Sequence, residues 1–131
     1  MPQGPKILQT RSLARSRCFH IEQMDLRFSN GTEVQYERIS SSPRGAVLII
    51  PMLDKYTVLL IREYAGGTQR YELGLPKGRI EPNEPVEEAA NREMMEEVGY
   101  AGRRFDRLPS MTIAPGYISH VSHPVLVRDL Y

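Results

Sequence analysis

The chain has 131 residues, a formal net charge of +1 and 40% hydrophobic residues, which suits a small globular protein with a modest core. A charge this close to zero gives no bulk attraction for nucleic acid or for a membrane surface. Its single cysteine, Cys18, excludes an intrachain disulfide. The N-terminus lacks the apolar stretch of a signal peptide, and no apolar run is long enough to span a bilayer. We therefore expect a cytoplasmic protein that has neither nucleic acid nor a membrane as a partner.

Apolar and polar residues alternate on both sides of a turn in the N-terminal third. The apolar positions are Met24, Leu26 and Phe28 before Asn30-Gly31, and Val34 and Tyr36 after it. An Asn-Gly pair flanked in this way predicts a β-hairpin, because both residues tolerate positive φ. We expect a small antiparallel β unit over about residues 7–40, followed by a linker at 40–45.

Five further strands and one helix are predicted in the rest of the chain. Apolar runs at 46–52 and 56–62 indicate a second hairpin whose strands are buried on both faces. The remaining predictions are a strand at 70–75, a loop at 75–82, and strands at 111–113 and 121–127 around a turn at 114–116. The helix is expected to begin near Pro85 and to end at Gly99, since proline suits a first helical turn and glycine a left-handed closing residue. This order of elements predicts an α/β domain.

The predicted helix carries an apolar stripe and, beside it, a patch of carboxylates. The stripe repeats every four residues and consists of Val86, Ala90, Met94 and Val98; it can face a sheet. In the patch, Glu97 lies four residues after Glu93, and Glu96 lies three residues after it. Like charges at these spacings each cost a few tenths of a kcal/mol in an isolated helix. The patch is therefore either a solvated acidic face or a site for a hard divalent cation, and spacing alone leaves both open.

A longer motif surrounds this patch. Seven residues fill the fixed positions of the pattern G-x5-E-x7-R-E-U-x-E-E-x-G-U, in which U is apolar: Gly78, Glu84, Arg92, Glu93, Glu96, Glu97 and Gly99. Met94 and Tyr100 fill the apolar positions. A chance match is on the order of one in a million. The chain thus resembles the Nudix hydrolases, which favours the cation site over a solvated face.

The resemblance implies a fold and a division into domains. It implies the Nudix fold, in which mixed β-sheets are sandwiched with helices, over residues 43–131. A small antiparallel β unit over residues 1–42 would precede it and would pair two copies of the chain. The chain stops directly after a strand, without a second long helix, and the general base of relatives often lies on a later loop. We therefore expect the C-terminal part of the fold to be missing from this sequence.

The resemblance also implies a magnesium site. Glu93 and Glu97 would ligate Mg²⁺, helped by Glu96 and by the backbone carbonyl of Lys77, and Mn²⁺ would be able to substitute. These ions bind oxygen ligands and share their coordination with substrate phosphates. The three glutamates are accordingly the catalytic candidates.

Three further residues of the motif would support this site. Arg92, also counted as catalytic, would orient the glutamates. Glu84 would act as an outer or additional ligand. Gly78 would let the backbone approach the metal, because it lacks a side chain.

Features outside the motif indicate a substrate class. Pro115, sixteen positions after Gly99, resembles the downstream proline of ADP-ribose pyrophosphatases, and the stretches at 61–64 and 71–74 resemble bacterial hydrolases of ADP compounds. The implied activity is cleavage of the diphosphate in ADP-ribose, NADH or short diadenosine polyphosphates, with release of AMP. The alternatives are a Nudix hydrolase of another nucleotide sugar or of a nucleoside triphosphate, and a Nudix module that senses nucleotides without cleaving them.

The chain departs from the ADP-ribose pyrophosphatases at two substrate-binding positions. Ala65 stands where an arginine is usual, so we expect the diphosphate clamp to fall to Arg62. Gly74 stands where a glutamate is frequent, and Glu72, on the same strand face, is the expected substitute.

Three tyrosines are candidates for stacking on adenine, which is worth about 1 to 3 kcal/mol per base. They are Tyr36, Tyr64 and Tyr71, and for each the alternative is a half-buried strand residue. Tyr36 is preferred, because in similar enzymes an aromatic residue of the N-terminal sheet reaches the partner's site. That analogy implies a homodimer.

Overall fold

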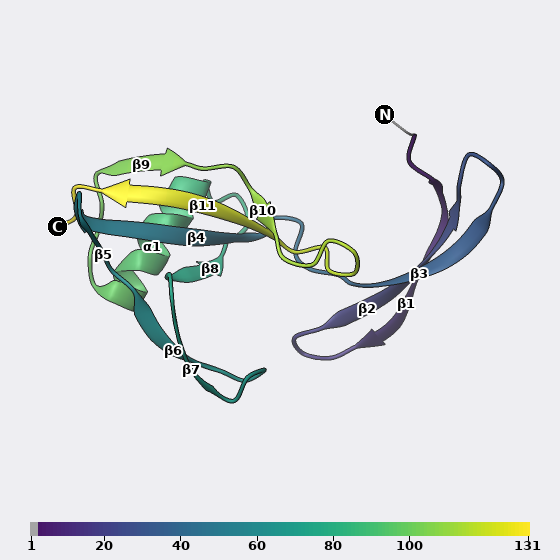
Figure 1. The fold of residues 1–131 in the computed structure, drawn as a ribbon, viewed down its shortest axis with the longest axis horizontal. Helices are drawn as coiled ribbons and strands as arrows, with labels where there is room; N and C mark the ends of the chain where they lie inside the picture. The colour runs from purple at the N-terminus through teal and green to yellow at the C-terminus, as the bar shows by residue number, and fades with distance from the viewer. Residues whose placement is uncertain (1–2) are drawn as a thin grey trace. The chain divides into compact units, whose positions relative to one another are not determined.

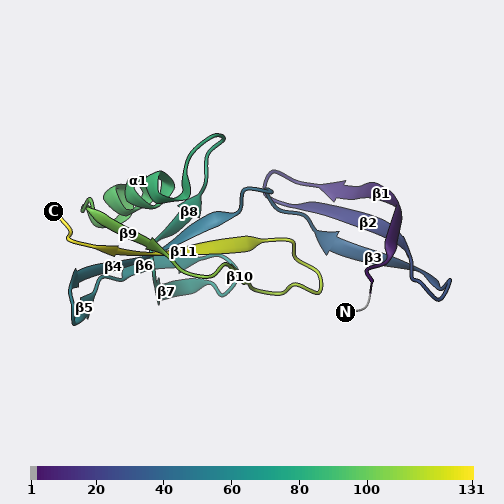
Figure 2. The same ribbon diagram turned by 90° about the horizontal axis from the view of Figure 1, so that it is seen from above.

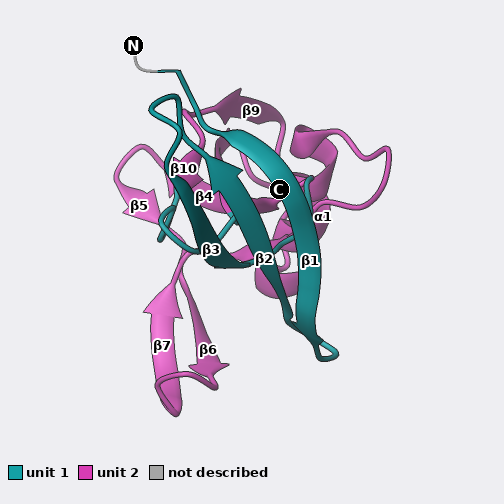
Figure 3. Ribbon diagram, turned by 90° about the vertical axis from the view of Figure 1, so that its right-hand side faces the viewer, with its two compact units in different colours: residues 1–43, 112–120 teal, residues 44–111, 121–131 magenta. Residues whose placement is uncertain are grey.

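The computed structural model describes residues 3–131 and divides the chain into two compact units (Figure 3). Unit 1 contains the chain up to Pro43 together with residues 112–120. Unit 2 contains residues 44–111 and 121–131. Each unit has its own sheet.

The sheet of unit 1 consists of three antiparallel strands in the order β1-β2-β3, as the alternation predicted. The strands are β1 (Lys6–Arg15), β2 (His20–Arg27) and β3 (Glu33–Ile39). The register pairs Met24 with Tyr36 and places both on one face. The β2–β3 turn differs from expectation, because Gly31 has a positive φ of 88° whereas Asn30 does not. The loop is longer than a two-residue hairpin, and the Phe28 N–H closes it on the Thr32 carbonyl at 2.9 Å.

Residues 112–120 join unit 1 along β3. The Ile39 N–H donates to the Tyr117 carbonyl at 2.7 Å, and the Ser119 N–H donates to the Ile39 carbonyl at 3.1 Å. The turn predicted at 114–116 is present, since the N–H groups of Tyr117 and Ile118 both donate to the carbonyl of Ala114. A segment far along the chain is thus built onto the N-terminal sheet.

The main sheet of unit 2 is mixed, and β4 and β11 run parallel at its centre (Figure 1). Its strands are β4 (Ala46–Asp54), β5 (Thr57–Val58), β8 (Lys77–Arg79), β9 (Arg104–Arg107), β10 (Met111–Thr112) and β11 (Val121–Arg128). β8 and β5 pair with β4, whereas β9 and β10 pair with β11. The helix α1 (Val86–Val98) covers one face of this sheet (Figure 2).

The core of unit 2 lies between α1 and the two central strands. Ala89, Ala90 and Met94 of the helix are fully buried against alternate residues of β4 and β11, namely Val47, Ile49, Val125 and Val127. Val86 and Val98 complete the predicted apolar stripe at the edge of this core. The ends of the helix are also as predicted: Pro85 is the extended N-cap residue, and Gly99, at φ 77°, returns its N–H to the Met95 carbonyl at 3.1 Å.

The strand predicted at 56–62 is wrong in extent and in burial. The chain pairs with β4 only at Thr57–Val58, then leaves it and forms a separate two-stranded hairpin from β6 (Ile61–Ala65) and β7 (Arg70–Gly74). Tyr56 is 85% exposed. An apolar run does not reveal a change of pairing partner, which is why the pattern failed here.

Two short strands were not predicted from the sequence. β8 forms within the predicted loop at 75–82, where three residues pair with the start of β4. β9 has the sequence Arg-Phe-Asp-Arg and packs only Phe105 against the core. Among the described residues, no helix has the length and apolarity needed to cross a membrane.

Candidate active site

The motif residues of unit 2 gather where β8 and the loop before the helix meet the middle and the last turn of α1. Arg92 is their centre. Its Nε and Nη2 donate to the two carboxylate oxygens of Glu84 at 2.8 and 2.9 Å, its Nη1 donates to Glu93 Oε1 at 2.8 Å, and Nη2 also donates to the Arg79 carbonyl at 2.9 Å. One planar guanidinium therefore ties the loop before the helix to β8 and to Glu93. Glu96 lies farther off, at 3.7 Å, and Glu88 makes no ion pair with Arg92.

Both carboxylate oxygens of Glu84 accept hydrogen bonds in this structure. Besides the two bonds from Arg92, its Oε1 accepts the Glu81 N–H at 2.9 Å, and its side chain is only 13% exposed. The hydrogen bonds from Arg92 come first among the causes that lower the pKa of Glu84 to about 2. Glu84 thus positions Arg92 in this structure, and its role as an outer or additional metal ligand stays a prediction.

Position 78 requires glycine because the Glu93 side chain lies against it, and not because of the backbone angles there. A Cβ at Gly78 would lie well inside the van der Waals radius of the Glu93 carboxylate. The half-buried Glu93 thus packs directly on the β8 backbone. The sequence predicted a close approach at this glycine, and the structure identifies the Glu93 side chain as the group that makes it.

Glu97 lies in the most strongly negative part of the site. Burial raises the pKa of Glu97 above its ordinary value, and the negative charges of Glu63, Glu93 and Glu96 raise it further. A hydrogen bond from the Lys77 N–H at 3.3 Å opposes that rise and places the Lys77 backbone beside Glu97. A nearby cation would lower the free energy of the charged form of Glu97.

The donor set fits a hard divalent cation that is only partly coordinated by protein. Glu93, Glu96 and Glu97 supply carboxylate oxygens, which Mg²⁺ prefers, and the ion commonly keeps waters and binds substrate phosphates. Within residues 3–131, no three acidic, histidine or cysteine side chains gather as a ready-made cage. Glu93 would have to turn from Arg92, and Glu96, whose side chain is 60% exposed, would have to turn inward.

Glu63, on β6, is a site residue that the sequence reasoning missed. It is the one carboxylate outside the helix that contributes to the raised pKa of Glu97. The β6–β7 register pairs it directly with Glu72, so both residues lie on the same face of the hairpin. This pairing depends on a four-residue turn at 66–69, whereas a two-residue turn at Gly66-Gly67 would pair Glu63 with Arg70, so the sequence alone did not indicate it.

The expected role of Arg62 conflicts with the register of the same hairpin. Arg62 pairs with Leu73 and therefore projects from the face opposite to Glu63. The prediction that Arg62 clamps the diphosphate is not supported by this placement. Glu72 does share the face of Glu63, where its Oε1 accepts a hydrogen bond from Arg70 Nε at 2.8 Å.

Tyr36 and Pro115 belong to unit 1, whereas all the other predicted site residues belong to unit 2. Tyr36 is half-exposed on β3 and contacts the ring of Phe28. Tyr64 and Tyr71 pack on each other edge to face across the hairpin, at 5.4 Å between ring centroids. The roles of Tyr36 and Pro115 in substrate binding stay predictions.

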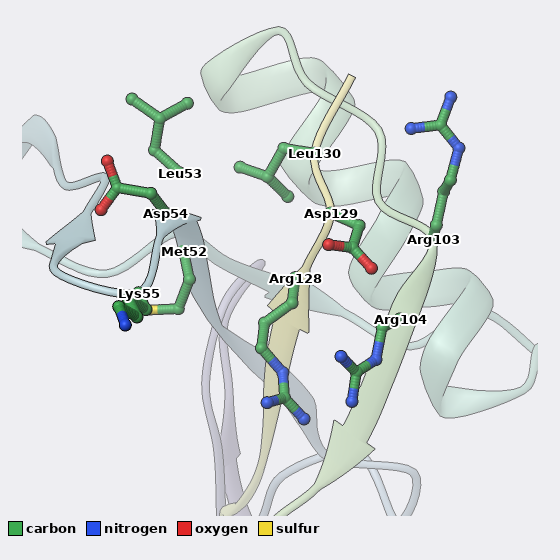
Figure 4. A pocket seen from close by; sticks show the side chains of 9 residues that line it. All are labelled: Met52, Leu53, Asp54, Lys55, Arg103, Arg104, Arg128, Asp129 and Leu130. Atoms are coloured by element: carbon green, nitrogen blue, oxygen red, sulfur yellow. The ribbon is translucent and has the colours of Figure 1, made fainter.

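Unit 2 also has a hollow of about 670 Å³ at the ends of β4, β9 and β11, which contains none of the predicted ligands (Figure 4). Two of its arginines interact with residues of the same unit. Arg128 pairs with Asp106, and Arg103, which points away from Arg104 and Arg128, stacks on the ring of Tyr131. We assign no substrate to this hollow.

Comparison with known proteins agrees with the motif and the fold. The family model described as the NUDIX domain matches residues 42–125, and the one described as the NudE-type Nudix hydrolase N-terminal domain matches residues 5–38. The chain therefore belongs to the Nudix hydrolase family, and the resemblance inferred from the motif is confirmed. Members of this family generally need a divalent metal ion.

Two relatives and one solved structure cover nearly the whole chain. The chain is 48% identical to the ADP compounds hydrolase NudE of Escherichia coli over 98% of its length and 69% of that protein. It is 24% identical to the ADP-ribose pyrophosphatase of Bacillus subtilis over 95% of its length and 69% of that protein. A crystal structure of an ADP compounds hydrolase superimposes with a TM-score of 0.90 at 47% identity, covering all of this chain and 70% of the other. This match confirms the predicted Nudix fold preceded by a small antiparallel sheet.

Proposed function

We propose that the chain is a Nudix pyrophosphohydrolase that cleaves the diphosphate linkage of ADP-linked metabolites and releases AMP. The observation that carries the proposal is the intact junction of β8 and α1, where Arg92 fixes the loop, Glu93 packs on the Gly78 backbone and Glu97 accepts the Lys77 N–H. The names of the similar proteins, an ADP compounds hydrolase and an ADP-ribose pyrophosphatase, support the substrate class.

Mg²⁺ is the proposed cofactor, and Mn²⁺ is expected to replace it. Glu93, Glu96 and Glu97 would hold the ion, with the Lys77 carbonyl as a further oxygen ligand. When bound, such an ion supplies an acidified water and offsets charge on diphosphate oxygens.

The chain's own residues would prepare this site rather than carry out the chemistry. Arg92 keeps Glu93 at the β8 backbone, because its other donors are fixed by Glu84 and by the Arg79 carbonyl. The hydrogen bond from Lys77 orients the carboxylate of Glu97. The fixed loop and backbone would thus confine the reorganisation that metal binding needs to the side chains of Glu93 and Glu96.

Incubation with ADP-ribose and Mg²⁺ is expected to release AMP and ribose 5-phosphate, and NADH and diadenosine polyphosphates are expected to release AMP as well. Chromatography of the products, with EDTA as a control, tests this. Cleavage of another nucleotide sugar or of a nucleoside triphosphate in place of these compounds would favour the first alternative. Saturable nucleotide binding without cleavage of any of them would favour a sensing module.

We also propose that two chains form a homodimer through unit 1. One face of its sheet carries Ile7, Met24, Leu26, Val34 and Tyr36, and no residue of β1 is buried. An apolar face on a sheet this small needs a partner. Sedimentation is expected to give twice the chain mass, and Met24→Lys should shift the protein towards monomer. Monomeric wild-type protein would contradict the proposal.

A further inference from the structure

The β6–β7 hairpin has two different faces. Its register, which has no bulge, pairs Ile61 with Gly74, Glu63 with Glu72 and Ala65 with Arg70 on one face. The other face carries the pairs Arg62–Leu73 and Tyr64–Tyr71. Paired residues project from the same side of an antiparallel ladder, and their Cβ atoms are neighbours.

The two faces differ in burial, although Glu63 and Arg70 are both exposed. Ile61, Ala65, Glu72 and Gly74 are all partly buried, and all four belong to the face of Glu63. By contrast, all four residues of the opposite face are exposed. The partly buried residues thus share the face of Glu63, whose charge acts on Glu97. We call this face the inner face below.

The two arginines of the hairpin are separated by these faces. Arg62 projects outward, whereas Arg70 lies on the inner face, one cross-strand pair beyond Glu63 and Glu72. Arg70 Nε donates to Glu72 Oε1 at 2.8 Å. Among the described residues, its two Nη groups have no hydrogen-bond partner, which leaves a fork of donors that suits a phosphate.

The negative charge of the surrounding glutamates is a further reason to expect that Arg70 binds an anionic group of the substrate. The inner face and the helix present Glu63, Glu72, Glu93, Glu96 and Glu97, so a diphosphate can approach only if cations offset them. Arg92 is already committed to Glu84, Glu93 and a backbone carbonyl. We propose that Arg70, rather than Arg62, binds a phosphate oxygen of the substrate, and that Glu72 positions it. The inference rests on the proposed function and adds the residue that holds the diphosphate.

A matched pair of variants tests the inference. Arg70→Ala and Arg62→Ala each remove one exposed arginine from the same hairpin, so the loss of net charge is equal, and melting curves compare the folding of the two variants. Arg70→Ala is expected to raise KM for ADP-ribose about tenfold or more, with kcat changed less than threefold, since a charged hydrogen bond to the ground-state diphosphate is lost. Arg62→Ala is expected to raise KM clearly less than Arg70→Ala does. Arg70→Lys should recover part of the loss, because it restores the charge without the fork.

The same variants are compared by calorimetry for binding of ADP-ribose. This measurement distinguishes a failure of the proposed function from a failure of the role proposed for Arg70. A wild-type chain that binds ADP-ribose without releasing AMP overturns the proposed function, and weaker binding by Arg70→Ala than by Arg62→Ala still supports Arg70. Equal effects of the two alanine variants, a larger effect of Arg62→Ala, or no binding by the wild type would overturn the role of Arg70.

Discussion

Glu97→Gln is expected to lower kcat for ADP-ribose on the order of a thousandfold while leaving the fold intact. A bound metal supplies several kcal/mol of stabilisation to a reacting phosphate, and every 1.36 kcal/mol is a factor of ten in rate. Glutamine keeps the size of Glu97 and can still accept the Lys77 N–H, so the change removes charge rather than packing. Steady-state kinetics measures the loss of activity, and calorimetric titration with Mg²⁺ measures the loss of metal binding.

The stability of the same variant has a predictable sign. Because folding raises the pKa of Glu97, the folded chain binds that proton more tightly than the unfolded chain. The charged carboxylate therefore costs stability above its folded pKa, including at neutral pH, and the cost is relieved as the pH falls. Without metal, Glu97→Gln is expected to be at least as stable as the wild type. With Mg²⁺, the wild type should gain the larger increase in Tm.

Glu88→Gln is the matched control for this experiment. Glu88 is an exposed glutamate of the same helix, and no ion pair to it is present within the described chain. Its substitution should leave kcat, metal binding and Tm close to those of the wild type. Full activity of Glu97→Gln, or equal losses in both variants, would remove Glu97 from the proposed metal site.

Gly78→Ala is the second change expected to have a large effect, about a hundredfold on kcat/KM. The added methyl group would occupy the space of the Glu93 carboxylate. That carboxylate is the flexible end of its side chain and can rotate away, so the cost in stability should stay at or below the roughly 1 to 3 kcal/mol of a typical overpacking change. Activity suffers more than stability, because Glu93 is moved from the place where it would meet a cation.

Gly66→Ala separates this effect from the general cost of replacing a glycine. Gly66 lies in the β6–β7 turn and does not have a positive φ, and no atom lies within 4 Å of the position that an added methyl group would take. It should keep near wild-type activity. Melting curves of both variants complete the comparison. A Gly78→Ala enzyme that retains wild-type activity would show that Glu93 need not stay against β8.

The elements that the sequence predicted well are those specified by local chemistry. Pro85 and Gly99 delimit α1 through their own backbone preferences, and the four-residue repeat of Val86, Ala90, Met94 and Val98 predicts the buried stripe without knowledge of the sheet. The alternation around Gly31 similarly predicted β2 and β3. The motif then indicated the family directly, because its fixed residues and their spacing can be recognised in a single sequence.

The features that could not be predicted from the sequence depend on pairing between distant segments of the chain. β8 and β9 are short and become strands only because β4 and β11 offer them free edges. The face of Arg62 could not be predicted for a related reason: the face from which a strand residue projects follows from the register, and a shift of one residue would have reversed it. Glu63 was overlooked because it is far from the motif in sequence and meets Glu97 only after folding.

The way Arg92 shares its donors has a consequence for how a cation would be loaded. If Glu93 leaves the guanidinium to bind an ion, the arginine keeps three of its four short hydrogen bonds, two to Glu84 and one to the Arg79 carbonyl. No stranded positive charge results, and Glu93 can change partner without loosening the loop. The β8–α1 junction would thus pass from a metal-free to a metal-loaded arrangement by rotation of the Glu93 and Glu96 side chains, while the loop held by Arg92 stays in place.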